Sequence, residues 1–269
     1  MANNNKLARK IHRLLREIRC PRWLHHFGPK KYRFEDHLTA LMSMQSFRLS
    51  FRRAAELLGL LGIKVPTYSA LCKMRKRIPA SLWNSLLKKT AGVKHERVAI
   101  DGTGFSTTNP SFHYLKRIDR KKPVKRYAKL SALFSLDSKK FIALKIRAKP
   151  RHDIKDVSYL LKQNNSMKKL FGDKEYDAES LHEYCWDNNI QTIIPKKINV
   201  QSGFYRRKQL RGYSDEEYHQ RSLIEAGFGS LKRKYGGYVL AKGFRSIRSE
   251  IYCKAICHNL SLRNQEIFN

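Results

Sequence analysis

The sequence has few acidic residues, and this shortage dominates its composition. Its 269 residues include 22 Asp and Glu against 56 Lys and Arg, which gives a formal net charge of +34 at pH 7. The excess is spread along the chain, because residues 1–100 hold 22 basic and 5 acidic side chains and residues 101–269 hold 34 and 17. A compact chain with this charge repels itself unless a polyanion offsets it. We therefore expect an extended footprint on nucleic acid.

Long apolar runs are also missing. No stretch approaches the 18 or more apolar residues of a membrane-spanning helix, and the N-terminal segment MANNNKLARK lacks the apolar core of a signal peptide. These absences exclude an integral membrane protein. They predict a cytoplasmic protein that has no membrane partner.

Cysteine is scarce, and its number is odd. Five cysteines without a secretory signal argue against a disulfide framework and predict reduced thiols. The stretch CKAICH places Cys253 and Cys257 one helical turn apart, next to His258. A zinc site would need further ligands that we cannot locate in the sequence. We therefore expect these thiols to be buried as small hydrophobic side chains.

The first third of the chain has the apolar spacing of helices. We expect helices over 1–20, 34–47 and 50–63, and a further helix that restarts after Pro66 and carries the basic run KMRKR. Two short helices, a glycine-containing break and a third helix resemble a helix-turn-helix unit. The alternative is a plain helical bundle with a solvated basic face.

This pattern predicts a helical DNA-binding domain over residues 1–92. The side chains expected to contact DNA lie in the KMRKR run, and they are Lys73, Arg75 and Lys76.

From residue 93 the pattern changes to short β-branched runs that alternate with helical segments. The predicted strands cover 97–106, 126–137, 140–148, 169–177 and 191–196. The predicted helices cover 153–164, 178–189 and 215–234. This order predicts an α/β domain over residues 93–269, with a mixed sheet and helices packed against it.

Three acids occupy positions where such a fold would bring them together. Asp101 ends the first predicted strand, Asp173 ends the fourth, and Glu225 lies on the last helix. Clustered carboxylates repel one another, and the natural offset is a divalent cation such as Mg²⁺. Each acid also has a simpler interpretation, because aspartates before or after glycine are common in turns and Glu225 could pair with Arg221.

The stretch YHQRSLIEAGFGSLK, residues 218–232, carries a polar stripe where a core-facing helix would carry Leu or Val. On one helix, Tyr218, Glu225 and Lys232 would fall nearly in register, and Arg221 would lie about 60° away. The stripe is either the wet face of a surface helix or a set of side chains that converges on something negatively charged.

The spacing Y-x2-R-x3-E-x6-K resembles the YREK signature of insertion-sequence DDE transposases. The stretches IDGTGFS and GDKEYD are similar to the two aspartate motifs of that family, in the same order and separated by 72 residues between Asp101 and Asp173. The resemblance covers residues 34–262 and includes the N-terminal helical segment. One position departs from the family, which usually has Gly where Glu175 stands.

The resemblance implies a ribonuclease H-like fold and a set of roles for the motif residues. Asp101, Asp173 and Glu225 would be catalytic and would bind two Mg²⁺ ions, for which Mn²⁺ would substitute. Tyr218, Arg221 and Lys232 would contact DNA near the cleaved phosphodiester.

The resemblance also implies a function and partners. A protein of this kind binds the terminal inverted repeats of its insertion sequence, cleaves double-stranded DNA there and joins the freed 3′-OH to target DNA, as a homodimer near the prokaryotic nucleoid. The basic run at 114–129 would clamp the DNA backbone, with Lys121, Lys122 and Arg126 as expected contacts. The alternatives are a metal-dependent nuclease of the same fold and a non-catalytic DNA-binding protein derived from a transposase.

Overall fold

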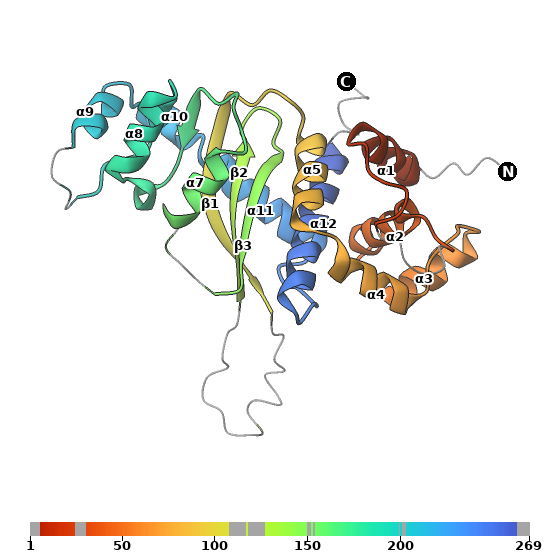
Figure 1. Cartoon of the computed structure of the whole chain (residues 1–269). Helices are drawn as coiled ribbons and strands as arrows, with labels where there is room; N and C mark the ends of the chain where they lie inside the picture. The colour runs from red at the N-terminus through yellow and green to blue at the C-terminus, as the bar shows by residue number, and fades with distance from the viewer. Residues whose placement is uncertain are drawn as a thin grey trace. The chain divides into compact units, whose positions relative to one another are not determined.

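The computed structural model describes residues 6–24, 31–107, 117, 127–149, 152, 154–198, 200 and 203–262. The chain forms two compact units, drawn in Figure 1. The helical unit consists of Met1–Thr90, Lys234–Gly236 and Ala241–Asn269, and the sheet unit consists of Ala91–Arg233 and Gly237–Leu240. Among the described residues, no helix combines the length and the apolar character needed to cross a bilayer.

Helices alone make up the described part of the helical unit, as the sequence predicted for the N-terminal region. They are α1 (Lys6–Glu17), α2 (Phe34–Ser46), α3 (Phe51–Leu60), α4 (Tyr68–Arg77), α5 (Ala80–Ala91) and α12 (Phe244–Leu262).

Two side-chain caps fix where α3 and α4 begin. Ser50 Oγ accepts a hydrogen bond from the backbone N–H of Arg53 at 3.3 Å, and Thr67 Oγ1 accepts one from that of Ala70 at 3.4 Å. Between the two helices Gly62 has a φ of +68°, a left-handed conformation that favours glycine. The local sequence therefore sets the start of α4, the helix that carries the basic run.

The C-terminal helix α12 belongs to the helical unit. Its Ser249 hydroxyl accepts a hydrogen bond from Trp83 Nε1 at 3.0 Å and donates one to the carbonyl oxygen of Arg75 at 2.8 Å. The sequence did not predict that α12 would group with the N-terminal helices, because helical periodicity does not say which surface a helix packs against.

The cysteines are free thiols, as predicted. Cys253 and Cys257 lie within α12 and are buried, and burial raises the pKa of Cys257 to about 12. Its sulfur lies 3.6 Å from the carbonyl oxygen of Met42 in α2. Both thiols therefore belong to the packed interior of the helical unit.

The sheet unit is built on a five-stranded mixed sheet in the order β3-β2-β1-β4-β5. The strands are β1 (Arg97–Ser106), β2 (Tyr127–Ser135), β3 (Phe141–Arg147), β4 (Lys169–Phe171) and β5 (Gln191–Ile193). Strand β2 pairs antiparallel with both β1 and β3. On the other side of β1, β4 pairs parallel with β1, and β5 pairs parallel with β4. This arrangement confirms the predicted ribonuclease H-like mixed sheet.

Helices cover the sheet within this unit (Figure 1). They are α7 (Ile154–Leu161), α8 (Glu179–Asp187), α9 (Phe204–Leu210), α10 (Asp215–His219) and α11 (Ser222–Tyr235), together with a short 3-10 helix at Lys174–Tyr176. A buried cluster that includes Ile100, Leu133, Leu160 and Leu170 joins strands β1, β2 and β4 to α7.

The approach of α11 to the sheet depends on a glycine. The helix buries Ile224, Phe228 and Leu231, and Phe228 stacks on Phe141 of β3 with ring centroids 5.6 Å apart. A Cβ atom at Gly227 would lie 2.6 Å from Phe134 of β2, so only glycine permits this close contact. The glycine therefore helps to set the position of the acid and the basic residues on α11.

The prediction of one continuous helix over 215–234 was wrong. Helix α10 ends at His219, and Gln220 and Arg221 form a turn before α11 begins at Ser222. The carbonyl oxygen of His219 accepts a hydrogen bond from the Ser222 hydroxyl at 2.8 Å, and such side-chain bonds compete with the helical pattern. Tyr218 and Arg221 are consequently not on the same helix as Glu225.

Candidate active site

The register of the two central strands places Asp101 and Asp173 at the same level. In the parallel pairing of β1 with β4, Ala99 lies opposite Phe171. Asp101 and Asp173 each come two residues after these partners, and Asp173 begins the short 3-10 helix, where its Oδ1 accepts a hydrogen bond from the amide of Glu175 at 2.9 Å. The predicted strand over 169–177 thus ends at Phe171, and a turn carries its aspartate.

The pKa of Asp101 depends on its burial and on nearby charges, including those of the other two acids. Its side chain is 18% exposed, and burial raises its pKa to about 6. The amide of Gly102 and the guanidinium of Arg221 lower this pKa, whereas the charges of Asp173 and Glu225 raise it further. These effects mean that three acids from β1, from the turn after β4 and from α11 lie within electrostatic reach of one another.

Arg221 lies between two of these acids. Its guanidinium lies 2.6 Å from Glu225 Oε1 and 3.7 Å from Asp101 Oδ2. The turn between α10 and α11 brings the arginine there, and Glu225 follows one turn later on α11. A single cation of this chain therefore offsets part of the repulsion within the acid cluster.

The donor set fits a hard divalent cation in its chemistry. Magnesium prefers carboxylate oxygens, and three carboxylates converge here. In the described part of the chain, no group of three Asp, Glu, His or Cys side chains is gathered closely enough to hold a metal ion. The three acids therefore interact electrostatically without being gathered as metal ligands, and the Arg221 guanidinium lies 3.7 Å from Asp101 and 2.6 Å from Glu225.

The remaining residues of the stripe lie on either side of this cluster. Lys232 of α11 donates a hydrogen bond to Thr103 Oγ1 of β1 at 2.6 Å, and burial lowers its pKa. The guanidinium carbon of Arg221 lies 5.8 Å from the ring centroid of Tyr218. The structure therefore brings Arg221 and Tyr218 together and places Lys232 two residues along β1 from Asp101.

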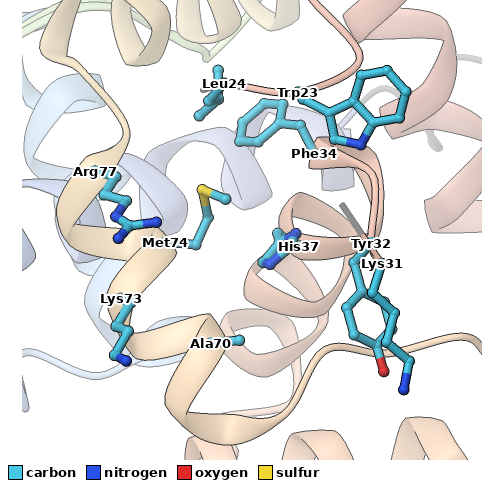
Figure 2. Close-up of a pocket in the computed structure, with 10 residues that line it drawn as sticks. All are labelled: Trp23, Leu24, Lys31, Tyr32, Phe34, His37, Ala70, Lys73, Met74 and Arg77. Atoms are coloured by element: carbon cyan, nitrogen blue, oxygen red, sulfur yellow. The ribbon is translucent and has the colours of Figure 1, made fainter. Parts of the chain in front are cut away.

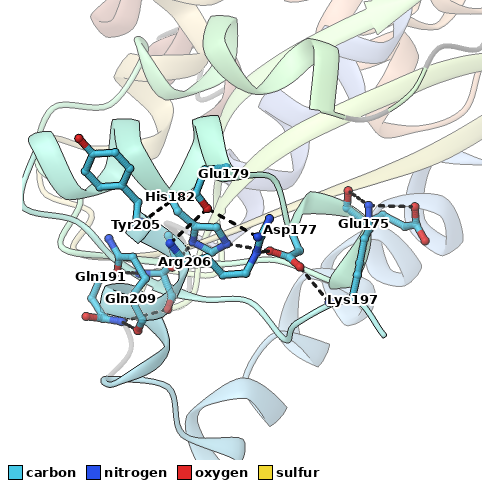
Figure 3. A network of polar contacts seen from close by, with 10 residues as sticks. Glu175, Asp177, Glu179, His182, Gln191, Lys197, Tyr205, Arg206 and Gln209 are labelled. Atoms are coloured by element: carbon cyan, nitrogen blue, oxygen red, sulfur yellow. Dashed lines mark hydrogen bonds and ion pairs between the residues drawn. The ribbon is translucent and has the colours of Figure 1, made fainter. Parts of the chain in front are cut away.

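Glu175, the acid that departs from the family pattern, is separate from the cluster. Its side chain is 63% exposed and lies 3.9 Å from Lys197 Nζ. Figure 3 shows this pair on the far side of the turn from Asp177. Glu175 therefore adds a surface ion pair and does not enter the set around Asp101.

A buried polar network holds the turn that carries Asp173, and the sequence analysis missed it (Figure 3). Asp177 Oδ1 accepts hydrogen bonds from Arg206 Nε at 2.6 Å and from the His182 ring at 3.0 Å. Its Oδ2 accepts one from the amide of Lys197 at 2.8 Å. The sequence signal for this network is Asp177 itself, the second aspartate of GDKEYD.

Removing the charge of Asp177 should destabilise the sheet unit. Asp177→Asn removes the carboxylate that pairs with the buried guanidinium of Arg206 at 2.6 Å and leaves it the more distant Glu179 at 3.6 Å, and breaking a buried ion pair costs up to about 3–5 kcal/mol. We expect a thermal unfolding midpoint lower by roughly 10 °C in calorimetry. Asp187→Asn, at an exposed aspartate of α8, is the control and should leave the midpoint unchanged. Equal midpoints for the two variants would contradict the role given to Asp177.

The basic run of α4 divides into exposed and buried side chains. Lys73 and Lys76 are exposed. Arg75 is 7% exposed, lies 3.5 Å from Glu250 and stacks over Phe51 at 4.5 Å, so the structure contradicts the prediction that it contacts DNA. Its position facing α12 explains the difference, because every third or fourth residue of α4 must turn inward. Lys121, Lys122 and Arg126 lie outside the described residues.

One protein family model matches this sequence over more than half of its length. The model of the family described as Transposase DDE domain matches residues 92–260. No curated protein matches the sequence significantly. Two solved structures are similar at low identity: a Mos1 transposase paired-end complex with left transposon end (12% identity, 84% of this chain and 87% of that chain covered, TM-score 0.27) and a pre-cleavage Mos1 transpososome (11%, 96% and 87%, TM-score 0.24).

Proposed function

The chain belongs to the transposase DDE domain family, and on that premise we propose that it is a DNA transposase that acts on the ends of its own insertion sequence. It would bind the terminal inverted repeats, hydrolyse phosphodiester bonds there and join the freed 3′-OH to target DNA. The observation that supports this proposal is the arrangement of the three acids: the register of β1 and β4 places Asp101 and Asp173 at the same level, and Arg221 lies 3.7 Å from Asp101 and 2.6 Å from Glu225.

In this proposal Asp101, Asp173 and Glu225 hold two Mg²⁺ ions, or Mn²⁺ in their place. Such ions, when bound, stabilise the attacking and leaving oxygens of an in-line phosphoryl displacement. The ionised carboxylates are anionic oxygen donors, the kind of ligand that a hard cation requires. The partial burial of Asp101 keeps its charge poorly solvated and ready to accept a cation.

The basic residues of the site would bind the DNA phosphates. Arg221 is a planar bidentate donor, and Lys232 presents an ammonium group that Thr103 already orients. Tyr218 would donate a hydrogen bond or stack on a base beside them. Without DNA, Arg221 pairs with Asp101 and Glu225. A DNA phosphate that binds its guanidinium would break these ion pairs, and the two carboxylates could then bind the cation.

Two DNA ends must meet for transposition, so the active complex would be at least a homodimer on double-stranded DNA. The net charge of +34 supports a large contact area with DNA. Lys73 and Lys76 on α4, with Lys121, Lys122 and Arg126, are the proposed backbone contacts outside the active site.

The decisive experiment incubates the full chain with a DNA duplex that carries the terminal repeat found beside its coding sequence, with Mg²⁺ or Mn²⁺ and a supercoiled target. Joined products that need both the metal and the repeat are the expected result. Nicks without joining would indicate a nuclease. Tight binding of the repeat without any cleavage would indicate a DNA-binding protein that has lost catalysis. Either result, nicking without joining or binding without cleavage, would overturn the proposal.

A further inference from the structure

A pocket of about 230 Å³ opens in the helical unit, beside α2 and α4 (Figure 2). All of its lining residues belong to the first 90 residues, and none of them belongs to the acid cluster. Its lining consists of Trp23, Leu24, Lys31, Tyr32, Phe34, His37, Ala70, Lys73, Met74 and Arg77.

The floor of the pocket is apolar and its walls are aromatic. Phe34 and Met74 are 2% and 6% exposed and form the base, with the Met74 side chain pointing into the space in Figure 2. The ring of Tyr32 meets that of His37 edge-on with centroids 6.1 Å apart. The guanidinium of Arg22 lies 4.7 Å from the ring centroid of Trp23, and Lys31 and Lys64 each lie 5.7 Å from that of Tyr32, so a planar guest would meet these rings beside cations.

The rim of the pocket is cationic. Lys31, Lys73 and Arg77 are exposed lining residues, and the lining contains no Asp or Glu. Lys73 and Arg77 are four residues apart on α4, so both ammonium and guanidinium groups stand on the face that Ala70 and Met74 present to the pocket. We therefore expect an anionic group to bind at the rim and a flat apolar group to bind in the interior of the pocket.

Aromatic platforms beside a positive groove are how proteins bind single-stranded nucleic acid, because every base has a face that stacks and every nucleotide a phosphate. A continuous duplex would use the rim alone, since its bases are stacked inside the helix. We propose that the pocket binds one unpaired nucleotide of DNA, with the base against the aromatic lining and the phosphate at Lys73 and Arg77. The inference rests on the proposed function, which supplies DNA with cut ends.

The test compares two duplexes of the same sequence in EDTA, one blunt and one with a three-nucleotide single-stranded 3′ overhang. Fluorescence anisotropy of labelled DNA measures the affinity of the full chain for each. We expect the overhang to bind about fivefold or more tightly, a typical gain for one base stacked on an aromatic side chain. In a Trp186→Phe background, the overhang should also quench the emission of Trp23, because the third tryptophan, Trp83, is fully buried.

Variants separate the pocket from general DNA binding. Tyr32→Leu and Lys73→Ala should each reduce the preference for the overhang toward one, and the exposed position of Lys73 makes its variant safe for folding. Tyr68→Leu is the matched control, because Tyr68 is an exposed aromatic residue of α4 that does not line the pocket. It should retain the full preference.

The outcomes are distinguishable. Equal affinity of the wild-type chain for both duplexes, or an unchanged preference in folded Tyr32→Leu and Lys73→Ala, would overturn the pocket proposal and leave the proposed function intact. Failure to bind either duplex would count against the proposed function itself. Displacement of the overhang by an acidic, aromatic peptide at lower concentration than by a trinucleotide would show that the pocket recognises protein, which also overturns the inference.

Discussion

Asp101→Asn and Glu225→Gln should each lower the rate of strand cleavage by about three orders of magnitude or more. The amide keeps the shape of the side chain but removes the anionic oxygen that a divalent cation requires. Neither variant removes a buried apolar group, and Glu225 is 55% exposed, so folding should persist. Single-turnover nicking of labelled repeat DNA measures the rate, and anisotropy measures DNA affinity, which should change by less than about threefold.

Glu175→Gln is the control for this experiment. Glu175 lies two residues from Asp173 in the sequence, yet its side chain is exposed and pairs with Lys197. Its variant should cleave at the wild-type rate. Undiminished cleavage by Asp101→Asn or Glu225→Gln would remove that residue from the active site, and a large loss in Glu175→Gln would mean that the cluster includes a fourth acid.

Arg221→Gln should have two opposite effects. It should lower the cleavage rate on repeat DNA by about 100-fold, because the variant lacks a charged donor for the reacting phosphate. It should also bind Mn²⁺ about tenfold more tightly in the absence of DNA, since a positive charge within 4 Å of two carboxylates competes with the cation. Electron paramagnetic resonance of free Mn²⁺ measures the affinity.

Arg97→Gln is the matched control for the arginine variant. Arg97 forms a comparable ion pair in the sheet unit, 2.6 Å from Asp137, and its Nη1 donates a hydrogen bond to Gln220 Oε1 at 2.9 Å, so its variant also reports whether loosening the turn beside Arg221 changes Mn²⁺ affinity. Its variant should leave Mn²⁺ affinity unchanged. If Arg221→Gln binds Mn²⁺ no more tightly than the Arg97 variant does, the guanidinium does not compete with the cation, and the exchange proposed for Arg221 is wrong.

The sheet and the acid cluster were accessible from the sequence because both depend on local patterns. β-branched runs predicted the strands, and the spacing of Asp101, Asp173 and Glu225 resembles a motif of the family whose model matches residues 92–260. The order of strands and helices then left few ways of arranging the sheet. The pattern predicted the identity of the elements, whereas Asp101 lies within β1, which continues to Ser106, and Asp173 lies two residues beyond the end of β4.

Features that depend on tertiary contacts were not accessible in this way. The turn at Gln220–Arg221 arises where the Ser222 hydroxyl binds a carbonyl oxygen, although the residues around it have ordinary helical spacing. Arg75 has the same sequence surroundings as Lys76 but faces Glu250 of a helix more than 160 residues away. The partners of Asp177 come from three further elements, and no short spacing records them.

Because α12 belongs to the helical unit, this unit cannot complete its fold until α12 has been synthesised. Ser249 and Cys257 contact residues of α4, α5 and α2, so part of the interior of this unit is contributed by a segment synthesised after the sheet unit. During translation the sheet unit can complete its fold while helices α1 to α5 still lack the surface of α12. A chain truncated before residue 244 would therefore contain a helical bundle with exposed apolar surface that is prone to aggregation. A separately expressed fragment of the helical unit would need to include α12.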